Sequence, residues 1–232
     1  MSKKEQKKSI DSKIATSVAH HKLLVSRTAH YSTFGTLTKK TESIWLIAHG
    51  YGQLARNMVR RFDHLDPQKH FVIAIEGLNR FYWHENNKPA ACWMTSEDRY
   101  DEIEDYVGYL DAIYSRYCRH VDYRKVKVNL FGFSQGCATL WRWIYAAQPH
   151  FHNMINWAGW IPEDLTYHHM SSYLREKKIY LHYGNNDHFI TEESAKDIAQ
   201  VIADNDLNVQ VSQFEGGHVI PKQELVEFIE RL

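Results

Sequence analysis

The chain has 232 residues, a length that suits one large α/β domain or two small ones. Lysine plus arginine equals aspartate plus glutamate at 28 each, so no net charge favours a nucleic acid or an anionic membrane as a partner. The three cysteines, Cys92, Cys118 and Cys137, are odd in number and widely spaced. This pattern argues against a disulfide framework or a paired-cysteine metal site, and it predicts a reducing, cytoplasmic location.

The N-terminal residues 1–18 are polar and rich in lysine, and we expect a flexible tail ahead of a single domain over residues 19–232. These first residues lack the apolar stretch of a signal peptide. No apolar run in the chain reaches the length of about 18 residues that would predict a membrane span. Residues 20–34 alternate in polarity and predict one or two strands, which could form a leading antiparallel pair.

Strands and helices are predicted to alternate along the rest of the chain. Continuous apolar runs indicate strands that are buried on both faces of a sheet, and apolar residues at helical spacing follow most of them. A long aromatic loop is expected over residues 76–95, and Thr95 with Asp98 forms a capping-box pattern for the helix after it. The predicted strands cover residues 44–48, 71–75, 126–131, 154–158, 179–183 and 209–214, and the predicted helices cover residues 54–65, 98–117, 135–147, 164–174, 191–205 and 222–232.

This alternation predicts a mostly parallel central sheet with helices on both faces. No connection is long enough to hold a large cap domain. Ligands of such sheets bind at the carboxyl ends of the strands, where most of the chain's glycines gather in short motifs.

The sequence Gly132-Phe-Ser134-Gln-Gly136 lies between a predicted strand and a predicted helix. A strand, a sharp turn and a helix are the context in which the pattern Gly-x-Ser-x-Gly indicates a nucleophile elbow. Ser134 would lie at the tip of the turn, and the two glycines would avoid clashes of a Cβ with the neighbouring strand and helix. The alternative is an ordinary tight turn with a capping serine.

A serine nucleophile needs a base, and the candidate base is His218 in a turn after the last predicted strand. Asp187, which follows the preceding strand, is the candidate acid that would orient the imidazole. The order Ser, Asp, His along the chain is the order found in α/β-hydrolases. Taken singly, the aspartate could instead cap a loop, and the histidine could simply be satisfied in its turn.

Two backbone N–H groups would stabilise the oxyanion, and the candidates are the amides of Tyr51 and Gln135. His49 is expected to pack and to form local hydrogen bonds. The pairs His20–His21 and His168–His169 raise the question of a metal. Neighbouring side chains on a strand point to opposite faces, and no carboxylate spacing accompanies either pair, so no metal site is expected.

The motifs together resemble those of α/β-hydrolases of the phospholipase/carboxylesterase kind, a group that includes the acyl-protein thioesterases. The resemblance spans roughly residue 43 to the C-terminus. It implies an α/β-hydrolase fold that hydrolyses carboxylic esters or acyl thioesters without a cofactor, with Ser134, Asp187 and His218 as the triad. The expected partner of this chain is a small-molecule ester substrate. It rests on His-Gly-Tyr-Gly52, Glu76-Gly77, Gly132-Phe-Ser-Gln-Gly136, Ala158-Gly159, Gly184-x-x-Asp187 and Gly217-His-x-Ile-Pro221.

The chain departs from this family pattern in two places, and both weigh against long-chain deacylation. Gln53 stands where the thioesterases usually have aspartate, and the aromatic loop differs from their acyl-binding segment. Trp93, Trp160 and Phe81 are the candidate walls of a short acyl pocket. The prediction is a serine carboxylesterase that prefers acyl chains of about two to six carbons to chains of about twelve to sixteen.

Several alternatives to this activity stay open. An acyl thioesterase or a lysophospholipase would use the same machinery. A catalytically silent hydrolase fold that only binds ligands, or an acyltransferase that keeps water from the acyl-enzyme, is also compatible with the motifs. The oligomeric state is not predicted.

Overall fold

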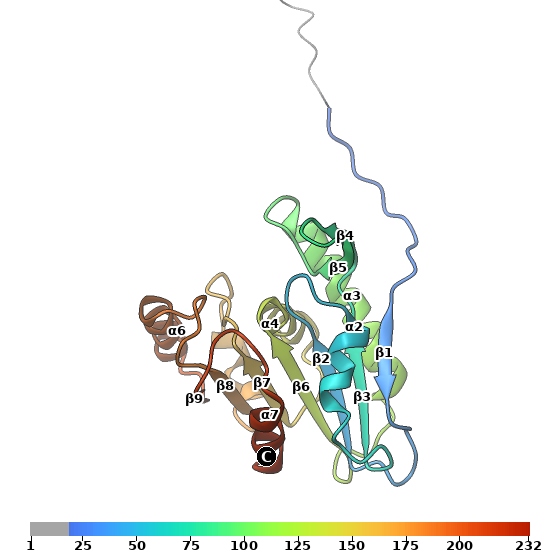
Figure 1. Ribbon diagram of the computed structural model, residues 1–232, viewed down its shortest axis with the longest axis vertical. Helices are drawn as coiled ribbons and strands as arrows, with labels where there is room; N and C mark the ends of the chain where they lie inside the picture. Colours follow the sequence, from blue (N-terminus) through green and yellow to red (C-terminus); the bar gives the residue numbers. More distant parts are fainter. Residues whose placement is uncertain (1–18) are drawn as a thin grey trace, which may run out of the picture.

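The computed structural model describes residues 19–232 and contains a seven-stranded sheet with the order β1-β3-β2-β6-β7-β8-β9 (Figure 1). Only β1 runs antiparallel to its neighbour β3, and every other neighbouring pair is parallel. The predicted mostly parallel sheet is therefore confirmed. Its strands are β1 (Tyr31–Phe34), β2 (Ser43–Ala48), β3 (His70–Ile75), β6 (Lys127–Phe133), β7 (Asn153–Trp157), β8 (Lys178–Gly184) and β9 (Val209–Phe214).

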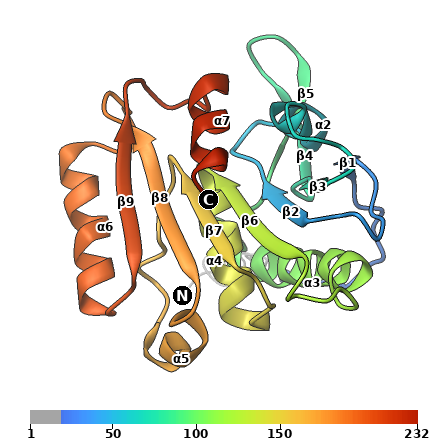
Figure 2. The same cartoon turned by 90° about the horizontal axis from the view of Figure 1, so that it is seen from below.

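The central strands form because their residues are apolar on both faces and the helices cover both. Every residue of β2 and of β7 is buried. Helices α2 and α7 lie on one face of the sheet, and α3 and α4 lie on the other (Figure 2). The helical elements are α2 (Ala55–Met58), the 3-10 turn Val59–Phe62, α3 (Arg99–Tyr117), α4 (Gln135–Ala147), the 3-10 turn His168–Met170, α5 (Ser171–Leu174), α6 (Glu192–Asp204) and α7 (Lys222–Glu230).

The register of the sheet brings the carboxyl ends of five strands close to one level. Ala48 at the end of β2 pairs with Gly132 near the end of β6. On the far side of β6, Phe133 pairs with Trp157, the last residue of β7. Gly184 at the end of β8 pairs with Phe214 at the end of β9. The loops that follow these strands therefore meet at the carboxyl edge of the sheet, where the sequence motifs lie.

The predicted aromatic loop is largely a β-hairpin. Strands β4 (Asn79–Trp83) and β5 (Lys88–Cys92) pair antiparallel and form a separate two-stranded sheet. In Figure 1 this hairpin projects beyond the carboxyl ends of β2 and β6. The burial pattern of β4 alternates between half-buried and exposed residues, so this strand is not part of the main core, whereas the last three residues of β5 are buried.

Of the one or two strands predicted within residues 20–34, the structure has one, β1, which pairs antiparallel with β3. Two other local predictions need correction. The helix predicted over residues 54–65 is only two short turns, α2 and the 3-10 turn after it. Helix α3 has no side-chain cap at Asp98, and both the amide and the hydroxyl of Thr95 donate to the carboxylate of Glu102 instead.

The expected tail, residues 1–18, lies outside the described residues, and the single domain over residues 19–232 stays a prediction. Within residues 19–232, none of the helices combines the length and the apolar composition that a membrane crossing needs.

Candidate active site

Ser134 lies in the turn between β6 and α4 with φ 52° and ψ −120°, a backbone conformation that residues other than glycine rarely adopt. The turn is possible because glycines flank it. A Cβ at Gly132 would lie 2.7 Å from the amide nitrogen of Cys137, and one at Gly136 would lie 2.8 Å from the carbonyl oxygen of His49. The Ser134 amide also donates to the carbonyl of Trp157 at 3.0 Å, which ties the turn to the neighbouring strand. The turn therefore has the geometry expected of a nucleophile elbow.

His218 lies between Ser134 and Asp187. Its Nε2 is 2.9 Å from Oγ of Ser134, and its Nδ1 is 2.8 Å from Oδ2 of Asp187. The Asp187 side chain is fully buried, and its Oδ1 accepts hydrogen bonds from the amides of Phe189 and Ile190 at 2.8 and 3.2 Å. With the Nδ1 proton directed at the carboxylate, Nε2 is free to accept the proton of the Ser134 hydroxyl.

The loops that carry Asp187 and His218 are in direct contact. The Asn186 amide donates to the carbonyl of Gly216 at 2.8 Å, and the Gly216 amide donates to Oδ1 of Asn185 at 3.1 Å. A Cβ at Gly184 would lie 2.6 Å from the carbonyl oxygen of Gly217. Only a glycine at position 184 allows the two loops to approach this closely, so it helps to set the distance between the acid and the base.

The Tyr51 amide lies in the loop after β2, and the Gln135 amide lies at the start of α4, directly after Ser134. Gln135 is the first residue of α4, and the first N–H groups of a helix have no carbonyl partner within it. In the loop after β2, the Gly50 amide donates to Oε1 of Gln53 and the Gly52 amide donates to the carbonyl of Ala91. Within the described part of the chain, these bonds leave the Tyr51 amide without an acceptor. Both amides are thus available to a ligand.

His49 and Trp93 fix the position of the loop that carries Tyr51. The Trp93 indole donates to the carbonyl of His49 at 2.7 Å, and the two rings pack with centroids 5.1 Å apart. His49 joins Gly50 to Gly77, because its Nδ1 lies 2.7 Å from the Gly50 carbonyl and its Nε2 accepts from the Gly77 amide at 2.9 Å. Burial lowers the pKa of His49 to about 4. A neutral ring is what these two bonds require, since one nitrogen must donate and the other must accept.

The side chain of Gln135 forms a contact that the sequence did not suggest. Its Oε1 accepts from the Trp93 amide at 3.1 Å, and its Nε2 donates to the Met94 carbonyl at 2.9 Å. The first residue of α4 is therefore attached to the segment that follows the β4–β5 hairpin. Sequence reasoning assigned Gln135 only a backbone role, since nothing in the sequence places residues 93 and 94 beside the elbow.

Two cavities open beside Ser134, and we call them cavity A and cavity B. Cavity A has a volume of about 510 Å³ and cavity B about 300 Å³. Cavity A is lined by Met94, Arg99, Ser134, Gln135, Ala138, Arg142, Trp160, Ile161, Pro162, Glu163, Asp164, Asp197, Ile198 and Val201. Cavity B is lined by Tyr51, Gln53, Arg61, Trp83, Phe133, Ser134, Phe189, His218, Val219 and Ile220.

The three aromatic residues predicted to line a pocket have different positions. Trp160 lines cavity A. Trp93 is only 1% exposed and lines neither cavity, because its ring packs against His49 and Tyr106 in the core. Phe81 also lines neither cavity and packs against the ring of Tyr51 at 5.3 Å. The pocket roles of Trp93 and Phe81 are therefore corrected, and the hairpin residue that lines cavity B is Trp83.

Residues 19–232 contain no group of three or more His, Cys, Asp or Glu side chains arranged to bind a metal ion. His169 instead packs edge-on against Tyr145.

Comparisons with solved structures show that the fold is widely shared. The acyl-protein thioesterase 2 of Zea mays is 15% identical, with a TM-score of 0.67 over 88% of this chain and 97% of the other. Esterase PE8 and YahD, the latter solved with malic acid, are each 14% identical, with a TM-score of 0.62 over 88% of this chain and 99% of theirs. These likenesses confirm the α/β-hydrolase fold.

A search of curated proteins found no match. The model of one family, described as serine hydrolase (FSH1), matches residues 63–227, which is more than half of the chain and includes Ser134, Asp187 and His218. The predicted resemblance to serine hydrolases is thus confirmed, and the chain belongs to the serine hydrolase (FSH1) family.

Proposed function

We propose that this serine hydrolase is a carboxylesterase in which Ser134 is the nucleophile, His218 the general base and Asp187 the acid that orients it. The observation that carries the proposal is the unbroken series of contacts from Oγ of Ser134 through both nitrogens of His218 to Asp187, at 2.9 and 2.8 Å. The Asp187 carboxylate is held by two backbone amides, so it can keep the imidazole in one orientation and stabilise the imidazolium.

The reaction would proceed through an acyl-enzyme. Oγ of Ser134 attacks the carbonyl carbon while Nε2 of His218 takes its proton. The oxyanion that forms is stabilised by the amides of Tyr51 and Gln135, whose positions are fixed by the contacts of His49, Trp93 and the Gln135 side chain. Collapse of the tetrahedral intermediate releases the alcohol, and water then hydrolyses the acyl-enzyme along the same route.

The proposed acyl group is short. Trp160 and the charged residues Arg142 and Asp164 line cavity A together with Ser134. The guanidinium of Arg142 bonds to Asp164 at 2.8 Å, and burying an alkyl chain against such an ion pair would cost the charges their hydration. A long acyl chain would therefore be accepted poorly.

An acyl thioesterase is the second candidate. The structural likeness to the maize acyl-protein thioesterase 2 favours it, since one fold and one set of catalytic residues can cleave both kinds of acyl group. A cytoplasmic location is also proposed, because all three cysteines are buried free thiols.

The test begins with a fluorophosphonate probe, which should modify Ser134 in the wild type and leave Ser134→Ala unlabelled when both are analysed by peptide mass spectrometry. Against short-chain esters, Ser134→Ala and His218→Ala should each lower kcat by about 10⁶-fold, and Asp187→Asn should be severe but less so. A matched panel of esters and thioesters then separates the two candidates. A Ser134→Ala variant that keeps a tenth of the wild-type activity would rule out the proposed nucleophile.

A further inference from the structure

The two cavities beside Ser134 are lined by different residues of the proposed catalytic site. His218 and the two residues after it line cavity B. None of these three lines cavity A, which instead includes Gln135 and Trp160. Ser134 is the one residue that lines both. An ester bonded to Ser134 would therefore extend into both cavities, with one half in each.

Stereochemistry decides which half enters which cavity. In the tetrahedral intermediate the carbon carries Oγ of Ser134, the oxyanion, the departing oxygen and the acyl chain. The oxyanion faces the amides of Tyr51 and Gln135. The departing oxygen must lie within about 2.6–3.2 Å of Nε2 of His218, because the proton taken from Ser134 is delivered to it as the carbon–oxygen bond breaks. The alcohol half must leave on the side of His218, which is the side of cavity B.

We propose that cavity B binds the alcohol half of the substrate and cavity A the acyl half, and that cavity B selects aromatic alcohols. This inference rests on the ester hydrolysis proposed above. Four aromatic side chains line cavity B, and two of them, Tyr51 and Phe189, are more than half exposed although they are large and apolar. Exposed rings grouped in a concave site are typical of surfaces that bind an apolar or aromatic ligand.

The charges around cavity B refine the substrate class. Arg61 and His218 are the basic side chains that line cavity B, and its lining includes no carboxylate. The guanidinium of Arg61 is fixed by donation to the carbonyl of Ile220 at 2.8 Å. Aromatic rings alone would also attract a quaternary ammonium group. The fixed cation opposes this, so the site favours a neutral arylmethanol, such as benzyl alcohol, over choline.

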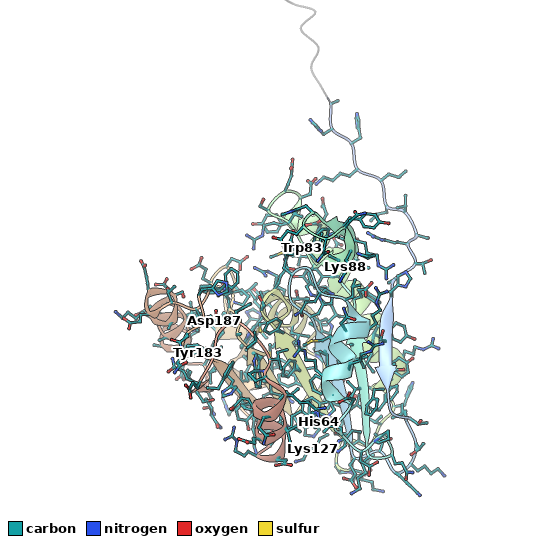
Figure 3. All side chains as sticks on the ribbon, in the orientation of Figure 1. His64, Trp83, Lys88, Lys127, Tyr183 and Asp187 are labelled. Atoms are coloured by element: carbon teal, nitrogen blue, oxygen red, sulfur yellow. The ribbon has the colours of Figure 1, made fainter. Side chains whose placement is uncertain are left out.

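Trp83 is the residue of cavity B that we expect to determine this specificity. Trp83 lies at the end of β4 in the β4–β5 hairpin, and Asp187 of the proposed triad lies in the loop after β8 (Figure 3). The Trp83 ring packs on Gly52, where a Cβ would lie 2.8 Å from Cε3, and it meets Tyr51 edge-on at 5.8 Å. The indole therefore forms a wall of the cavity and also contacts the loop that carries the Tyr51 amide.

The experiment measures kcat/KM on two series of esters with purified full-length protein. One series keeps a butyryl group and varies the alcohol among ethyl, cyclohexylmethyl, benzyl and choline. The other keeps ethanol and varies the acyl group from acetyl to octanoyl. We expect the wild type to prefer benzyl to ethyl butyrate by about tenfold or more. Trp83→Ala should remove that preference and leave the order of the acyl series unchanged, while Trp160→Ala should change the acyl order alone.

Tyr82→Ala is the matched control, because Tyr82 is an aromatic residue of the same hairpin that is 69% exposed and lines neither cavity. It should leave both series unchanged. Trp83→Leu provides a second variant with an aliphatic side chain that fills part of the space, so the alcohol preference can be measured if Trp83→Ala fails to fold.

Each outcome decides between the possibilities. If Trp83→Ala alters the acyl order, or Trp160→Ala alters the alcohol preference, the two halves have been assigned to the wrong cavities. An active wild type with no preference for benzyl over ethyl, or with a preference for choline, refutes the selection of aromatic alcohols and leaves the esterase proposal intact. A wild type that neither reacts with the fluorophosphonate probe nor hydrolyses any ester refutes the proposed function and this inference together.

Discussion

A single methyl group at Gly184 should separate the loops that hold Asp187 and His218. A Cβ there would lie 2.6 Å from the Gly217 oxygen and closer still to the Gly216 oxygen, whereas ordinary contact begins at 3.4 Å. The loops of Gly184→Ala must therefore move apart by about 1 Å, which would stretch the 2.8 Å contact between Asp187 and His218. A displacement of this size typically costs about 10²-fold in rate, and overpacking of this kind costs about 1–3 kcal/mol in stability.

The assay compares kcat/KM on a short-chain ester with the free energy of unfolding in urea. Gly217→Ala is the control, because a Cβ there would meet only the Asn186 oxygen, at an ordinary 3.6 Å. It should keep nearly wild-type activity and stability. The reasoning is refuted if a folded Gly184→Ala hydrolyses the ester as fast as the wild type, or if Gly217→Ala loses as much activity.

Two further predictions concern stability. Burial lowers the pKa of His49 to about 4, below the value of about 6.5 in the unfolded chain. The neutral ring therefore stabilises the fold fully above about pH 6.5, and this contribution is lost as the pH falls toward 4. At pH 5 the free energy of unfolding should have fallen by about 2 kcal/mol from this source. In urea unfolding, the free energy of unfolding should differ less between pH 7.5 and pH 5.0 for His49→Asn than for the wild type. An equal difference in the two proteins would contradict the prediction. Gly108 lies inside α3 with no atom within 4 Å of its would-be Cβ, so Gly108→Ala should raise the free energy of unfolding by up to about 1 kcal/mol, and a lower Tm would count against it.

The buried strands and the elbow could be predicted because their information is local. The apolar run at residues 44–48 is bounded by polar residues and glycine, and β2 differs from it by one residue. Helix α4 begins and ends where predicted, at Gln135 and Ala147, because the turn before it and Pro149 after it leave little choice. The order of the motifs along the chain was enough to suggest that residues 134, 187 and 218 meet.

The positions of the aromatic residues could not be predicted, since they depend on contacts between distant segments. Trp93 and Trp83 are the same residue type, ten positions apart, yet Trp93 is buried beneath His49 and Trp83 lines cavity B. The hairpin itself was missed because β4 is half exposed and carries no apolar alternation that faces the core. Its turn does contain a signal, since Asn87 takes a positive φ of 52°, a conformation that asparagine adopts more readily than most residues.

The three buried thiols offer a way to measure how often local parts of the structure open. Burial raises the pKa of Cys118 to about 12 and raises those of Cys92 and Cys137 as well, so very little thiolate exists near neutral pH. An alkylating reagent can then react only when the surrounding structure opens. The three sites lie at the end of the hairpin, just after α3 and beneath the Ser134 turn. Alkylation rates resolved by peptide would therefore compare how often each of these regions opens, without introducing any new cysteine.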